Sequence, residues 1–463
     1  MTHGPADPPE RSLVILGGGI TGLAAAWLAV KNRRDVTVLE SAGSFGGLLA
    51  TFPIGDTRLE CFYHHVFTHD RELQWLLSEL GLSGALTFHD GTMGLFSGGK
   101  LSDLNSPRDF MRLNSLGFAE KWRFLLTTLY LGAGADWRRA ENVPALAWLA
   151  RHSGPAVADS VWRPLLEMRF GSRADRVPLS WVVGRLRQRM RSRRSVRERL
   201  GYIEGSFHRL LEALKASLVA AGARLVSAAP VVSLDVRDGR LVGVRTPKGD
   251  FAGGQFLSTL PTTRLADLVR PHAVAYADAL GRVPYLGVVC TVLELERPAS
   301  RVYWTNVADA GFPFGGAIEH TNLVGTAMYG GRHVLYLSRY FSPDDEWARL
   351  PETECGERME NALGRLAGGE PPRVLARHVF RSPAAAVACG TDFSLAIPDC
   401  RSPVEGLYMT GMCHMYPDER SCNNSVRVAA EACRVMGMDV SFVPRGLSLA
   451  GRIGMGERVP AVI

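Results

Sequence analysis

The chain has 463 residues, of which 46% are hydrophobic and 21% are charged, and its formal net charge is +7. This balance is typical of a folded globular protein with room for two lobes, and it excludes a disordered or fibrous chain. No apolar run reaches the length of about 18 residues that a membrane-spanning helix needs, and the polar start of the chain lacks the apolar core of a secretory signal. The eight cysteines form no CxxC pair and no zinc-binding spacing, so we expect reduced thiols, no metal site and a cytoplasmic protein.

The first predicted elements are a strand, a glycine turn, a helix and a second strand. The turn GGGITG contains Gly17, Gly19 and Gly22, and the apolar run 36–39 ends at Glu40. This order and spacing are those of a dinucleotide-binding site. Gly17 permits the tight turn, Gly19 lets the backbone approach a pyrophosphate, and Gly22 lets helix and strand pack closely. The carboxylate of Glu40 can accept hydrogen bonds from a ribose.

A second glycine pair, Gly46 and Gly47, follows the acid and offers another close backbone approach to the same ligand. With this pair the sequence resembles the flavoprotein superfamily of flavin amine oxidases, protoporphyrinogen oxidases, phytoene desaturases and UDP-galactopyranose mutases. Members often carry Arg or Lys where this chain has Leu48. The resemblance implies FAD as the cofactor. A nicotinamide dehydrogenase, the alternative, would not need the second glycine pair.

Two histidines, His64 and His65, follow the second glycine turn at the point where relatives bring the chain across the flavin. In UDP-galactopyranose mutases a histidine of this region lies by the isoalloxazine ring. The resemblance implies that His64 or His65 bonds the flavin, or acts as a base near neutral pH. A structural histidine at the end of a strand is the alternative.

The segment that follows is predicted to be mainly helical, with helices over residues 71–80, 118–131, 143–151 and 156–170. The last of these resembles a substrate-lobe helix of the protoporphyrinogen-oxidase branch. The resemblance implies that Arg163 or Arg169 reaches the substrate. Exposed arginines on the helix surface are the alternative.

Eight arginines then gather between residues 185 and 199. Arg187, Arg189 and Arg191 of this block are predicted to bind a phosphate or carboxylate of a small-molecule substrate. A solvated face and contact with anionic lipid stay open as alternatives, with lipid contact the less favoured. No aromatic ladder or nucleic-acid motif accompanies the block, so we expect no nucleic-acid partner.

Residues 201–260 resemble the part of the superfamily in which the chain returns to the cofactor. Val231 matches the valine that contacts the adenine of the flavin nucleotide in relatives, close to the start of a strand predicted at residues 230–234. The valine of a strand core is a compatible interpretation.

The second substrate segment is predicted to contain strands over residues 286–294 and 333–340 and a helix over residues 352–366. Monoamine and polyamine oxidases of the superfamily usually carry a lysine here that is linked to the flavin. This chain has no lysine after Lys248. A simple amine oxidase is therefore disfavoured. No cysteine stands in the superfamily's attachment context, so we expect non-covalent FAD.

The last cofactor segment begins with a short strand that ends at Gly411, followed by a helical run from residue 423. In the superfamily this helix begins beside the flavin, where its dipole stabilises negative charge on the reduced ring. The resemblance therefore implies cofactor contacts at Gly411, Asn424, Ser425 and Val426.

These observations predict an α/β fold, in which a Rossmann-like FAD-binding domain is interleaved with an α+β substrate-binding domain. The FAD-binding domain is expected in three parts, at residues 11–69, 201–269 and 396–437. The substrate-binding domain is expected at residues 70–200 and 270–395, and residues 438–463 are expected to form a tail.

Two classes of enzyme remain. The first is an FAD-dependent oxidoreductase that takes hydride from a C–C, C–O or C–N bond of a small, anionic or sugar-containing substrate, in specialised-metabolite or glycan biosynthesis. The second is a mutase-like isomerase that acts on a nucleotide sugar without net oxidation. An inactive flavoprotein-fold scaffold is a third alternative. The missing uridine-binding signature favours the oxidoreductase.

Overall fold

A parallel five-stranded sheet grows from the glycine turn at the start of the chain. In the computed structural model, which describes residues 11–112, 116–194, 197–309 and 311–446, the strand order is β11-β2-β1-β15-β21. The bounds are β1 Ser12–Leu16, β2 Asp35–Leu39, β11 Arg224–Val226, β15 Gln255–Ser258 and β21 Leu407–Met409. Three segments far apart in the sequence supply these strands, because β1 pairs with β2 and β15, and β15 pairs with β21. The predicted interleaved α/β fold is confirmed.

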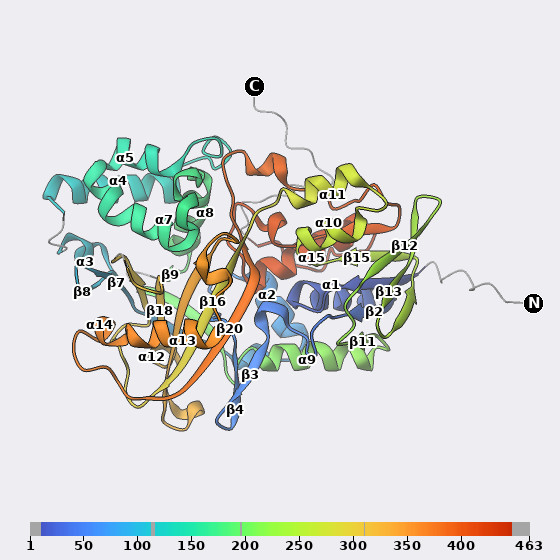
Figure 1. Ribbon diagram of the computed structural model, residues 1–463, viewed down its shortest axis with the longest axis horizontal. Helices are drawn as coiled ribbons and strands as arrows, with labels where there is room; N and C mark the ends of the chain where they lie inside the picture. Colours follow the sequence, from blue (N-terminus) through green and yellow to red (C-terminus); the bar gives the residue numbers. More distant parts are fainter. Residues whose placement is uncertain (1–10, 113–115, 195–196, 310, 447–463) are drawn as a thin grey trace, which may run out of the picture.

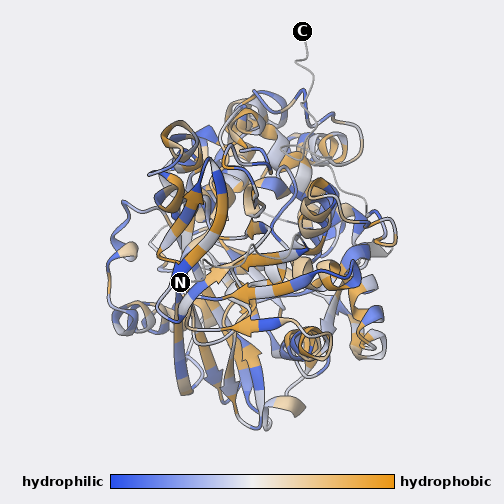
Figure 2. Ribbon diagram, turned by 90° about the vertical axis from the view of Figure 1, so that its right-hand side faces the viewer, coloured by the Kyte–Doolittle hydropathy of each residue, from blue (hydrophilic) through white to orange (hydrophobic). Residues whose placement is uncertain are grey.

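Helices cover this sheet because their apolar faces need a partner. In α1 (Ile20–Lys31) the run from Gly22 to Ala29 is buried. It packs against α9 (His208–Ala220) and α15 (Cys422–Val435), and α15 also contacts α2 (Arg71–Glu79). Figure 2 shows orange strands inside the molecule and blue segments around its outside, as a buried apolar core requires.

A seven-stranded sheet forms the second lobe, in the order β20-β16-β19-β18-β17-β7-β8. The bounds are β7 Met93–Ser97, β8 Lys100–Asp103, β16 Tyr285–Leu295, β17 Trp304–Val307, β18 Gly316–Glu319, β19 His333–Phe341 and β20 Val374–Val387. Two of these strands, β7 and β8, come from the segment predicted to be mainly helical. They join the sheet because β7 pairs in parallel with β17, a partner more than 200 residues later in the chain.

A helical region lies beside the seven-stranded sheet, at the upper left of Figure 1. It consists of α3 Pro107–Met111, α4 Phe118–Ala133, α5 Ala145–Ser153, α6 Pro155–Val157, α7 Arg163–Phe170 and α8 Leu179–Arg191. The apolar faces of α4, α5 and α8 meet in one core with Leu131, Leu149 and Val183. Within the described ranges, no helix combines the length and the apolar character that crossing a bilayer requires.

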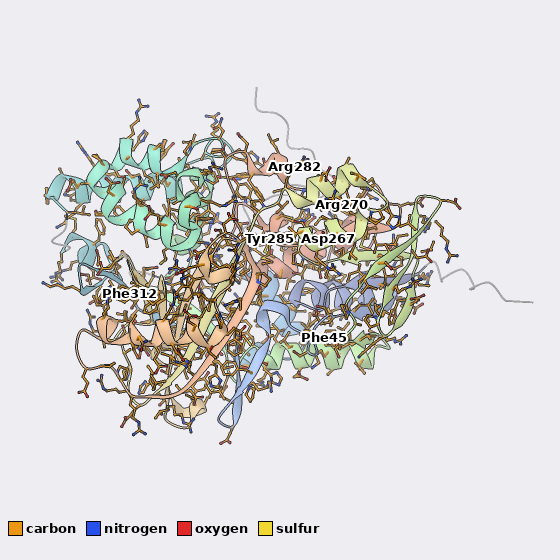
Figure 3. The ribbon with its side chains drawn as sticks, viewed as in Figure 1. Phe45, Asp267, Arg270, Arg282, Tyr285 and Phe312 are labelled. Carbon is orange, nitrogen blue, oxygen red and sulfur yellow. The ribbon has the colours of Figure 1, made fainter. Side chains whose placement is uncertain are left out.

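Smaller elements connect these parts. The remaining strands are β3 Thr51–Ile54, β4 Thr57–Glu60, β5 Val66–Phe67, β6 Leu86–Gly91, β9 Arg193–Arg194, β10 Arg197–Ile203, β12 Ser233–Arg237, β13 Arg240–Thr246 and β14 Gly249–Ala252. The remaining α-helices are α10 Thr262–Val269, α11 Val274–Gly281, α12 Thr321–Val324, α13 Glu352–Asn361 and α14 Leu363–Ala367. The hydroxyl of Tyr285, labelled in Figure 3 near Asp267 and Arg270, accepts the N–H of Thr262 at 3.2 Å and ties β16 to α10.

Two segments differ from the sequence-based expectation. Val231 precedes β12 instead of lying inside a strand. The first part of the expected tail packs onto the fold, because Val443 is buried and the N–H of Gly446 bonds Glu72 Oε1 at 2.8 Å. The burial of apolar side chains and this hydrogen bond hold residues up to Gly446 against α2. The sequence of this segment is rich in loop-forming residues and therefore did not indicate that it packs. Residues 447–463 of the expected tail lie outside the described residues.

Buried carboxyl groups make the stability of the fold depend on pH. Glu60 accepts hydrogen bonds from the hydroxyl of Tyr202 at 2.8 Å and from the N–H of Phe207 at 2.6 Å. Burial outweighs these bonds and raises the pKa of Glu60 to about 7. Burial also raises the pKa of Glu319, on β18, to about 8.

We expect the melting temperature to fall as pH rises from about 6.5 to 8. This pH range lies above the ordinary pKa of histidine, so the titration of histidines in the unfolded chain contributes little to the change. The folded chain binds these protons more tightly than the unfolded chain, so stability is lost as pH rises through the raised pKa values. Thermal melts of Glu60→Gln should show a shallower decline, because the amide keeps the shape without the buried charge. The exposed Glu204→Gln is the control. An unchanged decline in Glu60→Gln would show that Glu60 does not contribute to it.

Candidate active site

Two glycine turns lie against each other at the carboxyl end of the five-stranded sheet. The N–H of Gly46 donates to the carbonyl of Gly18 at 2.9 Å, and Gly19 forms an isolated bridge with Gly46. Gly17, Gly46 and Gly47 have φ values of +111°, +130° and +58°, a range that favours glycine. The backbone of both turns therefore lies next to the start of α1, with few side chains in between.

Gly22, the third glycine of the first turn, allows the turn and α1 to pack closely. A Cβ at Gly22 would lie 2.0 Å from the carbonyl oxygen of Gly17, so a side chain there would disrupt the turn. A Cβ at Gly19 would meet nothing closer than 3.8 Å. Gly19 is the N-cap of helix α1 and provides no side-chain cap, which leaves the first turn of the helix suited to an anionic group. These features fit a pyrophosphate.

Glu40 follows β2 at the same edge of the sheet. Its Oε2 accepts the N–H of Gly18 at 2.7 Å and its Oε1 accepts the N–H of Ala42 at 2.8 Å. Oε1 also accepts a hydrogen bond from the hydroxyl of Ser41 at 3.1 Å, so it is Oε2 that keeps a further lone pair for a ribose hydroxyl. The ring of Phe45 packs over Gly18, and Figure 3 labels Phe45 near α9.

The other expected nucleotide contacts lie nearby in the fold. Gly411 comes directly after Thr410, whose N–H bonds Ser258 at the end of β15. Val231 is buried, and its carbonyl accepts a hydrogen bond from Arg264 Nη2 at 3.0 Å. The carboxyl edge of a parallel sheet is where α/β folds bind nucleotides. The residues present fit the AMP half of FAD and its pyrophosphate.

The first turn of α15 contains Asn424, Ser425 and Val426, all buried. Ser421 caps this turn by accepting the N–H of Asn424 at 3.0 Å. The side-chain amide of Asn424 donates to the carbonyl of Glu419 at 2.7 Å, and Ser425 Oγ donates to that of Ser421. These side chains are occupied within the protein, so cofactor contacts from this turn fall to the backbone and the helix dipole.

The two histidines occupy different surroundings. His64 Nδ1 lies 2.6 Å from the carbonyl of Phe62. His65 packs edge-on against Phe67, and its Nδ1 is buried without a hydrogen-bond partner. Burial and the neighbouring Arg420 lower the pKa of His64 to about 4, and burial and Arg189 lower that of His65 to about 3. Both rings are therefore neutral near pH 7, suited to hydrogen bonding rather than to proton abstraction.

A cluster of two arginines, a tyrosine and a glutamate lies between α7, β19 and the segment before α15. Tyr340 Oη accepts a hydrogen bond from Arg420 Nη2 at 3.0 Å and lies 3.5 Å from Arg169 Nη1. Arg169 Nη2 forms an ion pair with Glu419 at 2.9 Å, and the Arg169 guanidinium lies over the Tyr340 ring at 4.8 Å. The hydroxyl of Tyr340 is thus held between two cationic groups.

This arrangement changes the acidity of Tyr340. Burial alone would raise the pKa of Tyr340, but Arg420 and Arg169 outweigh burial and lower it below its ordinary value. Tyr63, which shares a hydrogen bond with Tyr340, has its pKa raised by burial. Tyr340 is the more acidic of the two phenols.

A pocket with about 360 Å³ of empty space, part of which is open to solvent, adjoins this cluster. Its charged wall contains Arg169, Arg420 and Glu419, together with Asp418. Its other lining residues are mainly apolar: Trp181, Ala386, Val387, Cys389, Phe393, Met412 and Tyr416. We call this space the apolar cavity. An apolar volume with a few converging polar groups is the usual form of a small-molecule site.

A second cavity of about 430 Å³, the polar cavity, lies where α8 meets the start of α2 and of α15. Arg187 and Arg191 line it, but so do the carboxyl side chains of Asp70, Glu72 and Asp418. Arg187 also donates to the carbonyl of Ala135. The mixed charge of this wall suits a polar ligand without favouring a strongly anionic one.

The other predicted substrate arginines have protein partners. Arg189 Nη1 pairs with the buried Glu198 at 2.8 Å and its guanidinium lies over Trp304. Arg163 is on an outward face of α7, paired with Asp159 at 3.4 Å and Asp175 at 3.2 Å. Arg163 lines neither cavity, because these surface carboxylates hold it.

Sequence reasoning missed most of the cluster around the apolar cavity. Arg420 and Glu419 lie in a segment of unusual polarity, and this polarity could have marked both residues as candidates for the site. Tyr340 is the second-last residue of β19 and carries no local mark; the packing of α7 and of the segment before α15 near β19 brings Arg169 and Arg420 to it.

Comparison with known proteins places the chain. A model of the family described as flavin containing amine oxidoreductase matches residues 20–418. Coproporphyrinogen III oxidase of Propionibacterium freudenreichii subsp. freudenreichii is 29% identical over 202 residues, which cover 41% of this chain and 37% of the oxidase. The match thus spans little more than a third of that protein's length.

Two further similarities extend along most of the chain. The chloroplastic/chromoplastic 15-cis-phytoene desaturase of Narcissus pseudonarcissus is 21% identical over 435 residues, covering 87% of this chain and 75% of the desaturase. The structure of reduced UDP-galactopyranose mutase superposes with a TM-score of 0.70 at 15% identity, covering 96% of this chain and 97% of the mutase. The family model covers well over half of the sequence, so the chain belongs to the flavin containing amine oxidoreductase family and is an FAD-dependent oxidoreductase.

Proposed function

We propose that the protein oxidises a small, partly apolar substrate that carries a carboxylate, by removing hydride from a C–H carbon so that a C–C, C–O or C–N bond becomes double. The observation that carries this proposal is that Arg169 and Arg420 both line one wall of the apolar cavity, next to Asp418 and Glu419, and that the Nε atom of each arginine is buried without a hydrogen-bond partner. Guanidinium groups bind carboxylates through paired hydrogen bonds, while the apolar lining takes up the rest of the molecule.

The nucleotide is assigned to the carboxyl edge of the five-stranded sheet. Gly17, Gly19 and Gly22 shape the pyrophosphate turn, Glu40 bonds the ribose and Val231 lies at the adenine. A second set of positions faces the rest of the cofactor: Gly46, Gly47, Gly411, Asn424, Ser425 and Val426. The apolar cavity includes Met412, next to Gly411, which supports an approach of substrate to the flavin end of the cofactor.

Bound FAD supplies a hydride acceptor in this reaction. Loss of hydride leaves a proton to be removed when the substrate bond becomes double. We assign its acceptance to the phenolate of Tyr340, which does not line the apolar cavity itself but is bonded and stabilised by Arg420 and Arg169 on the cavity wall. His64 and His65 stay neutral and serve as hydrogen-bonding groups beside the reacting region.

A nucleotide-sugar isomerase is the second candidate, supported by the histidine pair and by Arg187 and Arg191 on the polar cavity. Glu72 and Asp418 on the same wall oppose the binding of a diphosphate there, and so does Asp70 when it is ionised, because burial raises the pKa of Asp70 to about 7. The oxidoreductase is therefore the better supported of the two.

The test is anaerobic mixing of the FAD-loaded full chain with carboxylate-bearing candidates, porphyrinogens among them, and with their neutral esters. We expect loss of visible flavin absorbance with a carboxylate substrate, and an apparent Kd at least about 10-fold weaker for its ester. Equal reduction by acid and ester would contradict the role of the arginines. Interconversion of nucleotide sugars by the pre-reduced protein, without flavin reoxidation, would establish the isomerase instead.

A further inference from the structure

Helix α4 exposes an unusual number of large apolar side chains. Phe118, Trp122, Leu126, Leu129 and Tyr130 are 72%, 49%, 62%, 56% and 56% exposed. Their spacing of three or four residues places them on one side of the helix. The exposed alanines at positions 119 and 133 extend this side, which we call the α4 stripe.

The opposite side of α4 is also apolar, because it belongs to the fold. Leu131 is fully buried, and Phe124 and Leu125 pack against the same core. A helix that is apolar on both sides normally has both sides buried against other parts of a protein or against lipid. The α4 stripe belongs to a helix of the helical region at the upper left of Figure 1, and this region lies away from the five-stranded sheet. It is therefore a surface for a partner outside the fold.

The charges around the stripe indicate what kind of partner fits. Arg123 on α4, Arg138 and Arg139 after its end, and Arg151 on α5 are all exposed. Asp136 is the exposed acid among them, and it pairs with Arg139 at 4.0 Å. Helix α5 is held at the stripe by Trp148, which stacks on Tyr130 with ring centroids 6.2 Å apart. The apolar stripe thus has a basic border.

We propose that α4 docks the protein onto the surface of an anionic lipid bilayer. The helix would lie in the plane of the membrane with Trp122, Leu126 and Leu129 inserted and Tyr130, at the margin of the stripe, at the headgroup level, while the bordering arginines meet lipid phosphates. A second copy of the chain is a poorer partner, because pairing two such faces would bring their arginine borders together. The proposal concerns a surface separate from both cavities and does not rest on the proposed reaction.

The test is flotation of the FAD-loaded full chain with two kinds of vesicle, one of phosphatidylcholine alone and one of phosphatidylcholine and phosphatidylglycerol in a two-to-one ratio. We expect binding to the anionic vesicles that weakens as salt rises. Trp122→Ser/Leu126→Ser should reduce the bound fraction roughly 10-fold or more, since it removes the inserted apolar area. Arg138→Gln/Arg139→Gln should weaken binding and flatten its salt dependence.

The matched control is Val219→Ser/Val274→Ser, two apolar residues that are 60% and 59% exposed on α9 and α11, away from the stripe. It should bind vesicles as the unmodified chain does. Absence of binding to anionic vesicles, or equal loss in the control, would overturn the proposal. A dimeric unmodified chain that becomes monomeric in Trp122→Ser/Leu126→Ser would also overturn it, because a second copy would then cover the stripe. Retained flavin absorbance shows that each variant is folded.

Discussion

Replacing Gly19 with aspartate is expected to remove most of the bound FAD while leaving the fold intact. Gly19 is the N-cap of α1, and a Cβ there would have 3.8 Å of clearance from its nearest neighbour. Aspartate is among the favoured N-cap residues, so the helix should tolerate it. Its carboxylate would face the position that we assign to the pyrophosphate. Like charges in contact cost several kcal/mol, so FAD affinity should fall roughly 100-fold or more.

The matched control is Gly19→Asn, which has the same shape and capping ability without the charge. Flavin absorbance after gel filtration, together with a thermal melt of the apoprotein, separates loss of cofactor from loss of fold. Gly22→Ala would be a poor test, because its Cβ would meet the Gly17 carbonyl and disturb the turn itself. Full retention of FAD by a folded Gly19→Asp would remove the pyrophosphate assignment.

The second large effect is expected from Tyr340→Phe. The ring packing is kept and the hydroxyl between Arg420 and Arg169 is lost. If the phenolate accepts the substrate proton, the rate of flavin reduction should fall by about 100-fold or more. FAD content should not change, since Tyr340 lies on the seven-stranded sheet and not in the nucleotide turns.

The pH dependence identifies the role. In the unmodified protein, flavin reduction should rise with pH as Tyr340 ionises, with a midpoint below the ordinary tyrosine value of about 10, because the two arginines stabilise the phenolate. That rise should be absent in Tyr340→Phe. Tyr303→Phe is the matched control, because burial raises the pKa of Tyr303, keeps it un-ionised over the same range, and Tyr303 takes no part in the cluster around Tyr340. A slow Tyr340→Phe variant that keeps the full pH profile would make Tyr340 a positioning residue.

The cofactor lobe was largely readable from the sequence, because its chemistry is local. A glycine turn needs its glycines within a few residues, and the acid must follow at the end of the next strand. Gly17, Gly19, Gly22 and Glu40 therefore appear in the structure in the relation that the sequence predicted. Helix periodicity likewise located α4 and α5, whose apolar residues recur at the spacing of a buried face.

The substrate side was decided by tertiary structure. Arg163 and Arg169 are six residues apart on one helix, yet one pairs with surface carboxylates and the other lines the apolar cavity. The row of arginines on α8 is split in the same way, with Arg189 neutralised by Glu198 and Arg187 left on the polar cavity. An arginine's partner depends on which distant chain segment packs against it, and local sequence carries no record of that. Tyr340 gains its acidity only because β19 and the segment before α15 bring Arg169 and Arg420 to its hydroxyl.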